Sequence, residues 1–199
     1  MKSFVFMIFG MAMSGAALAA PSTHVEFAYI LGGENNSRGG NEEKSGFEFA
    51  GAYAFDEHWY VGGVIGSYDR RNTADNDYIN ANGGYVFSLT PKINLTAEGG
   101  LWFGEQKNNN GTKTDPRAIE AKAGLDTMIS DKFALFGTFS IVRGDLDTPV
   151  NDDLSNFIWS LGGAYSFTDR ISLNVKLVNG VNGVNGQDEV LRIAGRWTF

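Results

Sequence analysis

The sequence predicts an all-β fold, an antiparallel up-and-down β-barrel built from ten strands. Three observations support this prediction. Residues 190–199 alternate between apolar and polar side chains and end on an aromatic residue, Phe199. Similar alternation recurs in nine earlier segments, and the connections between the segments are alternately short and long. After the N-terminal segment, no apolar run approaches the ~20 residues of a membrane-spanning helix, so any passage through a membrane has to be made by strands.

The N-terminal segment is predicted to be a secretory signal peptide. Lys2 provides a positive charge, residues 4–13 form an apolar stretch, and Ala17-Leu18-Ala19 is a small-x-small cleavage site. The stretch is too short, and its flanks are wrong, for an N-terminal membrane anchor. We therefore expect a signal peptide over residues 1–19 and an exported β-barrel domain over residues 20–199.

Composition excludes several classes of site. The chain has no cysteine, which rules out disulfides, thiolate metal sites and a cysteine nucleophile. Its formal net charge of −7 opposes a nucleic-acid partner, because phosphate binding needs a basic face. The 26 glycines and 4 prolines suit a twisted all-β chain.

The predicted strands cover residues 23–33, 45–55, 58–68, 77–88, 92–104, 117–129, 132–143, 155–167, 170–178 and 189–199. Four connections are tight turns, at 56–57, 89–91, 130–131 and 168–169. The other five are longer and polar, at 34–44, 69–76, 105–116, 144–154 and 179–188. Tight turns at one end and long loops at the other are typical of membrane β-barrels.

The tight turns carry an internal repeat. Residues 53–61 match residues 165–173, and weaker copies surround the turns at 89–91 and 130–131. The equivalent positions recur every 34 to 40 residues, which indicates a repeated hairpin.

One face of each predicted strand is apolar and carries no charged residue. A Lys or Arg that faces lipid at mid-depth costs ~2–4 kcal/mol, which would explain the absence of charge. Aromatic residues gather at both ends of these faces, as in the interfacial girdles of membrane barrels: Phe55, Trp59, Phe87, Phe133, Phe167, Trp197 and Phe199 at the turns, and Tyr29, Phe103 and Phe157 toward the loops. A soluble sandwich also alternates, but a soluble barrel would be apolar inside, whereas here the opposite faces are charged.

These opposite faces, predicted to line the lumen, carry the candidate site. Its charged residues are Glu26, Glu48, Glu98, Lys122, Asp126, Lys176, Arg192 and Arg196. Inside a narrow lumen such charges have to be paired. Arg192 and Arg196 lie on the strand that closes against the first, so we expect them near Glu26 and Glu48. Two interpretations stay open: a structural salt-bridge plug and an ion-conducting constriction.

The pattern resembles bacterial outer-membrane β-barrels of the opacity-type and porin-like superfamily, and within it the membrane domain of outer-membrane protein A. The alternation, the turn repeat and the terminal Trp197-Thr198-Phe199 carry this resemblance. It implies a location in the outer membrane of a Gram-negative bacterium, with outer-membrane lipids, periplasmic chaperones and the barrel assembly machinery as partners. It also implies that Trp197 and Phe199 form the assembly signal. Small barrels of this kind commonly have eight strands, so eight remains an alternative to ten.

No catalytic, cofactor or metal site is predicted, and we expect the protein not to be an enzyme. The hydrolases among outer-membrane barrels need a Ser–His pair on the lipid face or a His at the loop rim, whereas His24 and His58 both lie at the turn end. The four aspartates of loop 144–154 could hold Ca²⁺, but the loop lacks the Gly and the distal Glu of an EF-hand, which favours a solvated acidic loop.

Two functions are compatible with these features. The first is a structural barrel or a narrow porin-like pore for small solutes or ions, which the polar lumen favours. The alternative is a surface adhesion or interaction barrel, whose acidic, Asn-rich loops would contact an extracellular ligand.

Overall fold

The structure, a computed structural model, describes residues 21–36, 41–70, 74–108, 113–145, 153–182 and 186–199. The expected signal peptide over residues 1–19 lies outside the described residues. Regular structure within these ranges is entirely β, in eleven strands: β1 (His24–Asn36), β2 (Asn41–Ala54), β3 (Trp59–Arg70), β4 (Ala74–Thr90), β5 (Ile93–Asn108), β6 (Lys113–Thr114), β7 (Arg117–Ser130), β8 (Phe133–Asp145), β9 (Asp153–Ser166), β10 (Ile171–Asn182) and β11 (Gly186–Thr198). Across the described part of the chain, no helix is long and apolar enough to cross a membrane.

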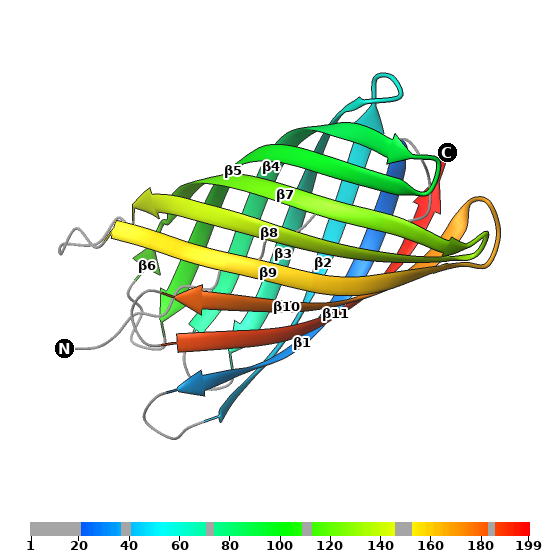
Figure 1. Cartoon of the computed structure of the whole chain (residues 1–199). Helices are drawn as coiled ribbons and strands as arrows, with labels where there is room; N and C mark the ends of the chain where they lie inside the picture. Colours follow the sequence, from blue (N-terminus) through cyan, green and yellow to red (C-terminus); the bar gives the residue numbers. More distant parts are fainter. Residues whose placement is uncertain (1–20, 37–40, 71–73, 109–112, 146–152, 183–185) are drawn as a thin grey trace.

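Ten of these strands form a closed antiparallel barrel (Figure 1). β1 pairs with both β2 and β11, and β4 pairs with both β3 and β5, which closes the ring. The first and last strands join over their whole length, from His24 opposite Thr198 to Asn36 opposite Gly186. The two-residue strand β6 pairs with the loop end of β5 in the same register as β7, so it continues the position of β7 beyond residues 115–116. The prediction of a ten-stranded up-and-down barrel is therefore confirmed, and the eight-stranded alternative is excluded.

The four tight turns lie together at one end of the barrel, with the C-terminus (Figure 1). We call this end the turn end and the opposite end the loop end. In each turn a side-chain oxygen accepts backbone N–H groups two or three residues further on; the accepting residues are Asp56, Thr90, Ser130 and Thr168. Short polar side chains favour this local bond over a continued strand. Their recurrence explains the turn repeat in the sequence.

At the loop end the strands run further than the sequence predicts. β5 continues to Asn108 rather than residue 104, and β10 continues to Asn182 rather than residue 178. Apolar alternation ends where the outer face leaves the lipid, but the backbone ladder does not depend on lipid and continues. At the other end, β11 stops at Thr198, although the backbone N–H of Phe199 still donates to the carbonyl of Thr23 at 3.0 Å.

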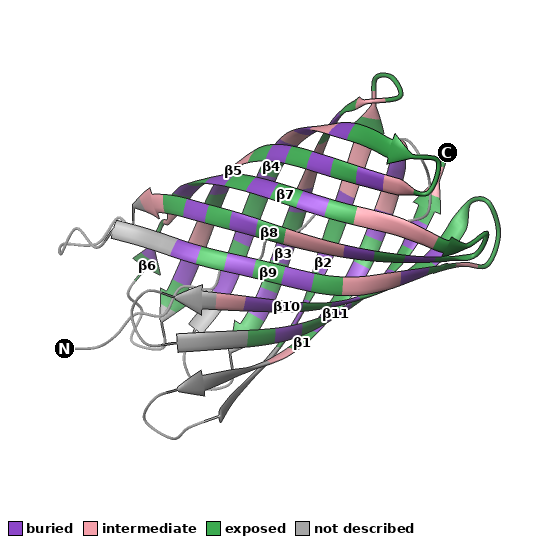
Figure 2. Cartoon of the chain, in the orientation of Figure 1, coloured by how far each residue is buried: buried purple, intermediate pink, exposed green. Residues whose placement is uncertain are grey.

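The outer face carries an apolar band all the way round the barrel, between the two aromatic girdles. Along each strand, buried and exposed residues alternate (Figure 2), and within this band the exposed residues are apolar, as the sequence predicts for one face of each strand. All ten residues of the two aromatic girdles are exposed, with Phe55 and Phe199 at 62% and 75%. A water-soluble protein would hide such a surface, and lipid is the environment that accommodates it.

Inward-facing glycines make room for the large side chains of the interior. A Cβ on Gly66 would overlap the ring of Tyr78, and a Cβ on Gly162 would lie 2.6 Å from Cζ of Phe136. Tyr78 and Phe136 are both buried. The interior of the barrel is thus filled by alternating small and large residues, as in other small barrels.

Candidate functional site in the barrel lumen

The inward-facing charges lie in two clusters, and the first joins the strands where the barrel closes. The guanidinium of Arg192 on β11 pairs with the carboxylates of both Glu26 on β1 and Glu48 on β2, with its Nε 2.6 Å from Glu48 Oε2. Arg196 lies four residues closer to the turn end on the same strand and places Nη2 2.8 Å from Glu26 Oε2. All four side chains are at least 95% buried.

Two neutral side chains complete this first cluster. The hydroxyl of Tyr78 on β4 donates to Glu48 Oε1, and Nδ2 of Asn174 on β10 donates to Glu26 Oε2 at 2.8 Å. The cluster therefore spans the lumen from β10 and β11 to β4. Two carboxylates face two guanidiniums, and both carboxylates receive additional hydrogen bonds, which is the arrangement that makes buried charges tolerable.

The second cluster lies on β4, β5 and β7. Lys122 Nζ is 3.0 Å from Glu98 Oε2, and both side chains are 2% exposed. Asn82 Nδ2 donates to the same oxygen at 2.6 Å. Glu98 and Lys122 stand directly opposite each other in the β5–β7 register. Here too the positive and the negative charge balance.

The remaining two predicted site residues are placed differently. Asp126 accepts a hydrogen bond from Asn94 Nδ2 at 3.0 Å, with no ion pair to the described residues. Lys176 is buried and stands opposite Arg192 in the β10–β11 register, and it too makes no ion pair within the described chain. The structure thus joins six of the eight charged residues into ion pairs and leaves Asp126 and Lys176 beside them.

Among the polar residues of the lumen that sequence reasoning missed are Tyr78, Asn82, Glu120 and Asn174. Glu120 Oε2 accepts the indole N–H of Trp102 at 2.9 Å. Each of the four lies on the inward face of a predicted strand, so the period-2 alternation could have found them. A search for charge alone passed over the tyrosine and the asparagines, whereas Glu120 is charged and was simply left out of the predicted set.

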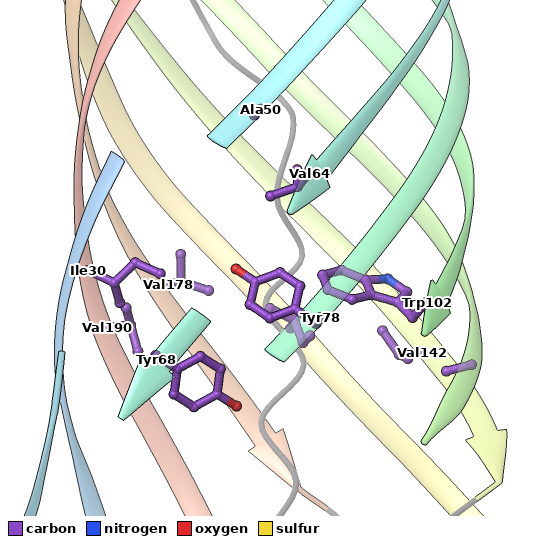
Figure 3. Close-up of a cluster of buried hydrophobic side chains, with 11 residues drawn as sticks. Ile30, Ala50, Val64, Tyr68, Tyr78, Trp102, Val142, Val178 and Val190 are labelled. Atoms are coloured by element: carbon purple, nitrogen blue, oxygen red, sulfur yellow. The ribbon is translucent and has the colours of Figure 1, made fainter. Parts of the chain in front are cut away.

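An apolar ring lines the lumen, and most of its members lie on the loop side of the charges. Every strand of the closed barrel contributes to it, and its members are Ile30, Ala50, Val64, Tyr68, Tyr78, Trp102, Ala118, Val142, Ile158, Val178 and Val190. Figure 3 shows these side chains directed into the interior. The rings of Tyr68, Tyr78 and Trp102 follow one another, with centroids 6.1 and 5.4 Å apart.

The register fixes the order of the two layers. On β11, Val190 lies two residues closer to the loop end than Arg192. On β10, Val178 bears the same relation to Lys176. On β2 the order is reversed, because Ala50 lies two residues closer to the turn end than Glu48. A solute that entered from the loop end would therefore meet most of the apolar ring before the charged clusters. Apolar constrictions oppose hydrated ions by dewetting, and charged ones select by sign.

Both histidines lie at the turn end, and the hydrogen bonds of His24 fix its tautomer. His24 Nδ1 is 2.8 Å from the backbone carbonyl of Ser22 and 3.4 Å from its Oγ. The carbonyl can only accept, which assigns the proton to Nδ1, so this nitrogen cannot serve as a base for Ser22. His58 stacks on Tyr85 at the turn end.

The described side chains also offer no metal site. Within the described ranges, no three His, Asp or Glu side chains are grouped to hold a metal ion. Residues 146–152, most of the acidic loop considered for Ca²⁺, lie outside them.

The two residues of the predicted assembly signal lie at the turn end. Trp197 is 49% exposed on the outer face, and Phe199 is 75% exposed. Trp197 stands opposite Val25 of β1 and Ile171 of β10, inside the belt of aromatic residues at this end.

Comparisons with known proteins agree with the barrel fold. The family described as "Protein of unknown function, DUF481" matches residues 16–184. No curated protein matches the chain in sequence. Among solved structures, the COG4313 outer membrane channel from Pseudomonas putida F1 aligns with a TM-score of 0.64 and 9% identity, over 95% of this chain and 100% of that one. The beta domain of the Bordetella autotransporter Brka aligns with a TM-score of 0.60 and 9% identity, over 90% and 100%.

The translocator domain of the autotransporter NalP from Neisseria meningitidis has a TM-score of 0.52 and 12% identity, over 96% of this chain and 91% of that one. At these identities the likeness concerns the fold. The fold shared by these structures is the outer-membrane β-barrel.

Proposed function

The chain belongs to the DUF481 family, and for this member of it we propose a narrow pore of the outer membrane that passes small ions and excludes larger solutes. The fold supports the membrane location, because its apolar outer face is continuous round the barrel. The filled lumen supports the narrow bore. The function is therefore set by the side chains in the lumen.

The contact of Arg192 with both Glu26 and Glu48 carries this proposal. One guanidinium bridges two carboxylates from different strands, deep in the lumen. An ion that passes this point has to move between paired charges, so its passage is slow and depends on its own charge. A wide aqueous pore would leave these charges solvated and would need no pairing.

A surface interaction is the second candidate. On β3 and β4 the outer face ends in exposed acidic residues, among them Asp69 and Asp77. Such residues could contact a cationic ligand. The tips of the predicted loops at 37–40, 71–73, 109–112, 146–152 and 183–185 lie outside the described residues.

Single-channel recording of the purified, folded protein in planar lipid bilayers tests the pore. We expect a small conductance, and a clearly larger one for Arg192→Ala, because this variant opens the bridge between Glu26 and Glu48. Glu48→Gln, which keeps the volume of the side chain, should raise the conductance as well. Arg170→Ala, in an exposed turn, is the matched control and should conduct like the wild type.

Three results would overturn the pore proposal. Absence of conductance in the wild type and in both lumen variants would leave a purely structural barrel. A large wild-type conductance that neither variant changes would show that ions bypass the charged clusters. Binding of a cationic ligand that is lost in Asp69→Asn and Asp77→Asn, without any channel activity, would favour the surface interaction.

A further inference from the structure

One buried carboxylate stands at the level of the apolar ring. Glu120 is the next inward residue after the ring member Ala118 on β7, and it lies opposite the ring member Val142 in the β7–β8 register. A third ring member, Trp102, donates its indole N–H to Glu120 Oε2 at 2.9 Å. Glu120 is only 6% exposed. An ion that crosses the ring therefore passes this carboxylate.

The other oxygen of this carboxylate, Glu120 Oε1, is buried and has no hydrogen-bond partner among the described residues. The nearest inward cation on the same strand, Lys122, pairs with Glu98 instead, with Nζ 3.0 Å from Glu98 Oε2. The hydrogen bond from the indole favours the ionised form of Glu120. Because an unsatisfied buried oxygen is costly, Oε1 has to be met by water or by an ion that enters the lumen.

Two asparagines of the lumen also present oxygen atoms rather than N–H groups. Asn82 Nδ2 donates to Glu98, and Asn174 Nδ2 donates to Glu26. Since each amide nitrogen is held by a carboxylate, the orientation of each amide is fixed and its oxygen is directed elsewhere. Both amide oxygens are buried without a hydrogen-bond partner in the described chain. These oxygens can accept from water or contact a cation, but they cannot bind an anion.

The charges of the lumen do not cancel on the side of Glu120. Between the turn end and the apolar ring every inward side chain is described, so the Asp, Glu, Lys and Arg residues there can be compared. On β5 and β7 the three acids Glu98, Glu120 and Asp126 share one cation, Lys122. The four paired residues of the first cluster balance, and Lys176 adds one positive charge beside them. Two negative charges and one positive charge are therefore uncompensated.

The uncompensated cation Lys176 stands apart from the uncompensated acids. It lies on β10, where its register neighbours are Arg192 and Gly162. The two strands between β7 and β10, which are β8 and β9, carry no charged residue on the described part of their inward faces. Lys176 therefore does not neutralise Glu120 by direct contact. An anion on its way to Lys176 still has to cross the ring in the field of Glu120.

We propose that the lumen prefers small monovalent cations to anions, and that Glu120 sets this preference at the apolar ring. The inference rests on the pore function proposed above and adds the sign of the ion. An ion gives up part of its hydration shell at an apolar constriction, and the free oxygen of Glu120 replaces that water for a cation. The same charge repels an anion where little water screens it. The amide oxygens of Asn82 and Asn174 continue the acceptor-lined path beyond the ring.

Reversal potentials of the folded protein in planar bilayers under a KCl gradient test the proposal, because they give the ratio of K⁺ to Cl⁻ permeability. We expect a ratio above one for the wild type. Glu120→Gln keeps the shape of the side chain and its acceptor for the Trp102 indole, and should lower the ratio about tenfold. Lys176→Met, which removes the opposing charge, should raise it. Glu57→Gln makes the same substitution in an exposed turn and should leave the ratio unchanged.

The outcomes separate this inference from the pore itself. A wild type that conducts with a ratio of one or below remains a pore, but its preference for cations is refuted. A ratio above one that Glu120→Gln does not change would refute the role of Glu120. Glu120→Asp keeps the charge and should retain the preference, so a loss in this variant equal to that in Glu120→Gln would show that packing rather than charge is responsible. Absence of conductance in the wild type would overturn both the pore and its selectivity.

Discussion

Glu48 and Arg192 are 144 positions apart in the chain, yet Arg192 Nε lies 2.6 Å from Glu48 Oε2 in the middle of the barrel. Between their strands lies β1, whose Glu26 also contacts Arg192. The contact therefore ties the C-terminal strand to the first two strands through side chains as well as through the backbone ladder. It stabilises the junction at which the barrel closes.

Removal of this guanidinium should destabilise the folded barrel. In Arg192→Ala the carboxylate of Glu48 keeps the Tyr78 hydroxyl but loses its cation, whereas Glu26 retains Arg196. An uncompensated buried charge costs about 3–5 kcal/mol, and less if water enters the lumen. Urea titration of the protein refolded in lipid vesicles measures this loss in the free energy of unfolding.

Two further variants define the origin of the effect. Arg170→Ala, at an exposed turn, should change the free energy of unfolding by less than about 0.5 kcal/mol. The double variant Glu48→Gln/Arg192→Ala should recover part of the loss, because no uncompensated carboxylate remains at position 48. Equal stability of Arg192→Ala and the wild type would mean that the lumen is wet enough to solvate both acids.

A second prediction concerns the close contact between Gly66 and Tyr78. The Cβ of an alanine at position 66 would overlap the Tyr78 ring, so Gly66→Ala should cost about 1–3 kcal/mol. In a Tyr78→Ala background the space is free, and the same substitution should cost much less. The matched control is Gly195→Ala on the outer face, where nothing lies within 4 Å of the added Cβ. Equal costs in both backgrounds would show that the ring is not what Gly66 accommodates.

Most of the fold could be predicted from the sequence, because period-2 alternation marks the strands. The outward apolar faces and the tight turns determine the number of strands, since each turn joins neighbours in an up-and-down barrel. Strand ends were harder to predict. At the loop end β4 and β5 stay paired beyond the apolar band, where their residues are polar. Alternation no longer distinguishes strand from loop there.

The lumen was less accessible to sequence reasoning. Alternation places Glu98 and Lys122 on inward faces, but their pairing depends on the register between β5 and β7, and the long connection between these strands does not fix that register. Lys176 illustrates the limit. Alternation correctly places its side chain inward, but whether it pairs with an acid depends on side-chain directions across the lumen. In the structure its register neighbour is the cation Arg192.

A third prediction concerns pH and the turn between β2 and β3. The backbone N–H groups of Trp59 and His58 donate to Asp56, which holds the pKa of that carboxyl below its ordinary value. The folded state then binds the proton less readily than the unfolded state. The contribution of the Asp56 carboxylate to stability is complete above the unfolded pKa of about 3.9. It is lost as the pH falls through the lower folded pKa.

Asp56→Ala should accordingly destabilise the barrel at neutral pH, and the difference from the wild type should shrink in acid. The equivalent residue of the β9–β10 turn, Thr168, makes the same backbone contacts without a charge. Thr168→Ala should therefore show a difference that does not change with pH. Urea titrations of both variants at neutral and at strongly acidic pH provide the measurement. A pH-independent difference for Asp56→Ala would contradict the role of its charge.

The last prediction concerns Phe199. Its side chain is 75% exposed at the turn end, so its truncation removes little packing, although the backbone N–H to Thr23 contact also goes when the residue is deleted. We expect its main role to be kinetic, as part of the Trp197-Thr198-Phe199 segment that the assembly machinery would recognise. Deletion of Phe199 should then reduce insertion into the outer membrane of cells far more than it reduces refolding in detergent. Phe199→Tyr, which keeps an aromatic ring, should insert almost normally. Equal losses in cells and in detergent would make Phe199 a packing residue, and normal insertion of the deletion variant would remove it from the assembly signal.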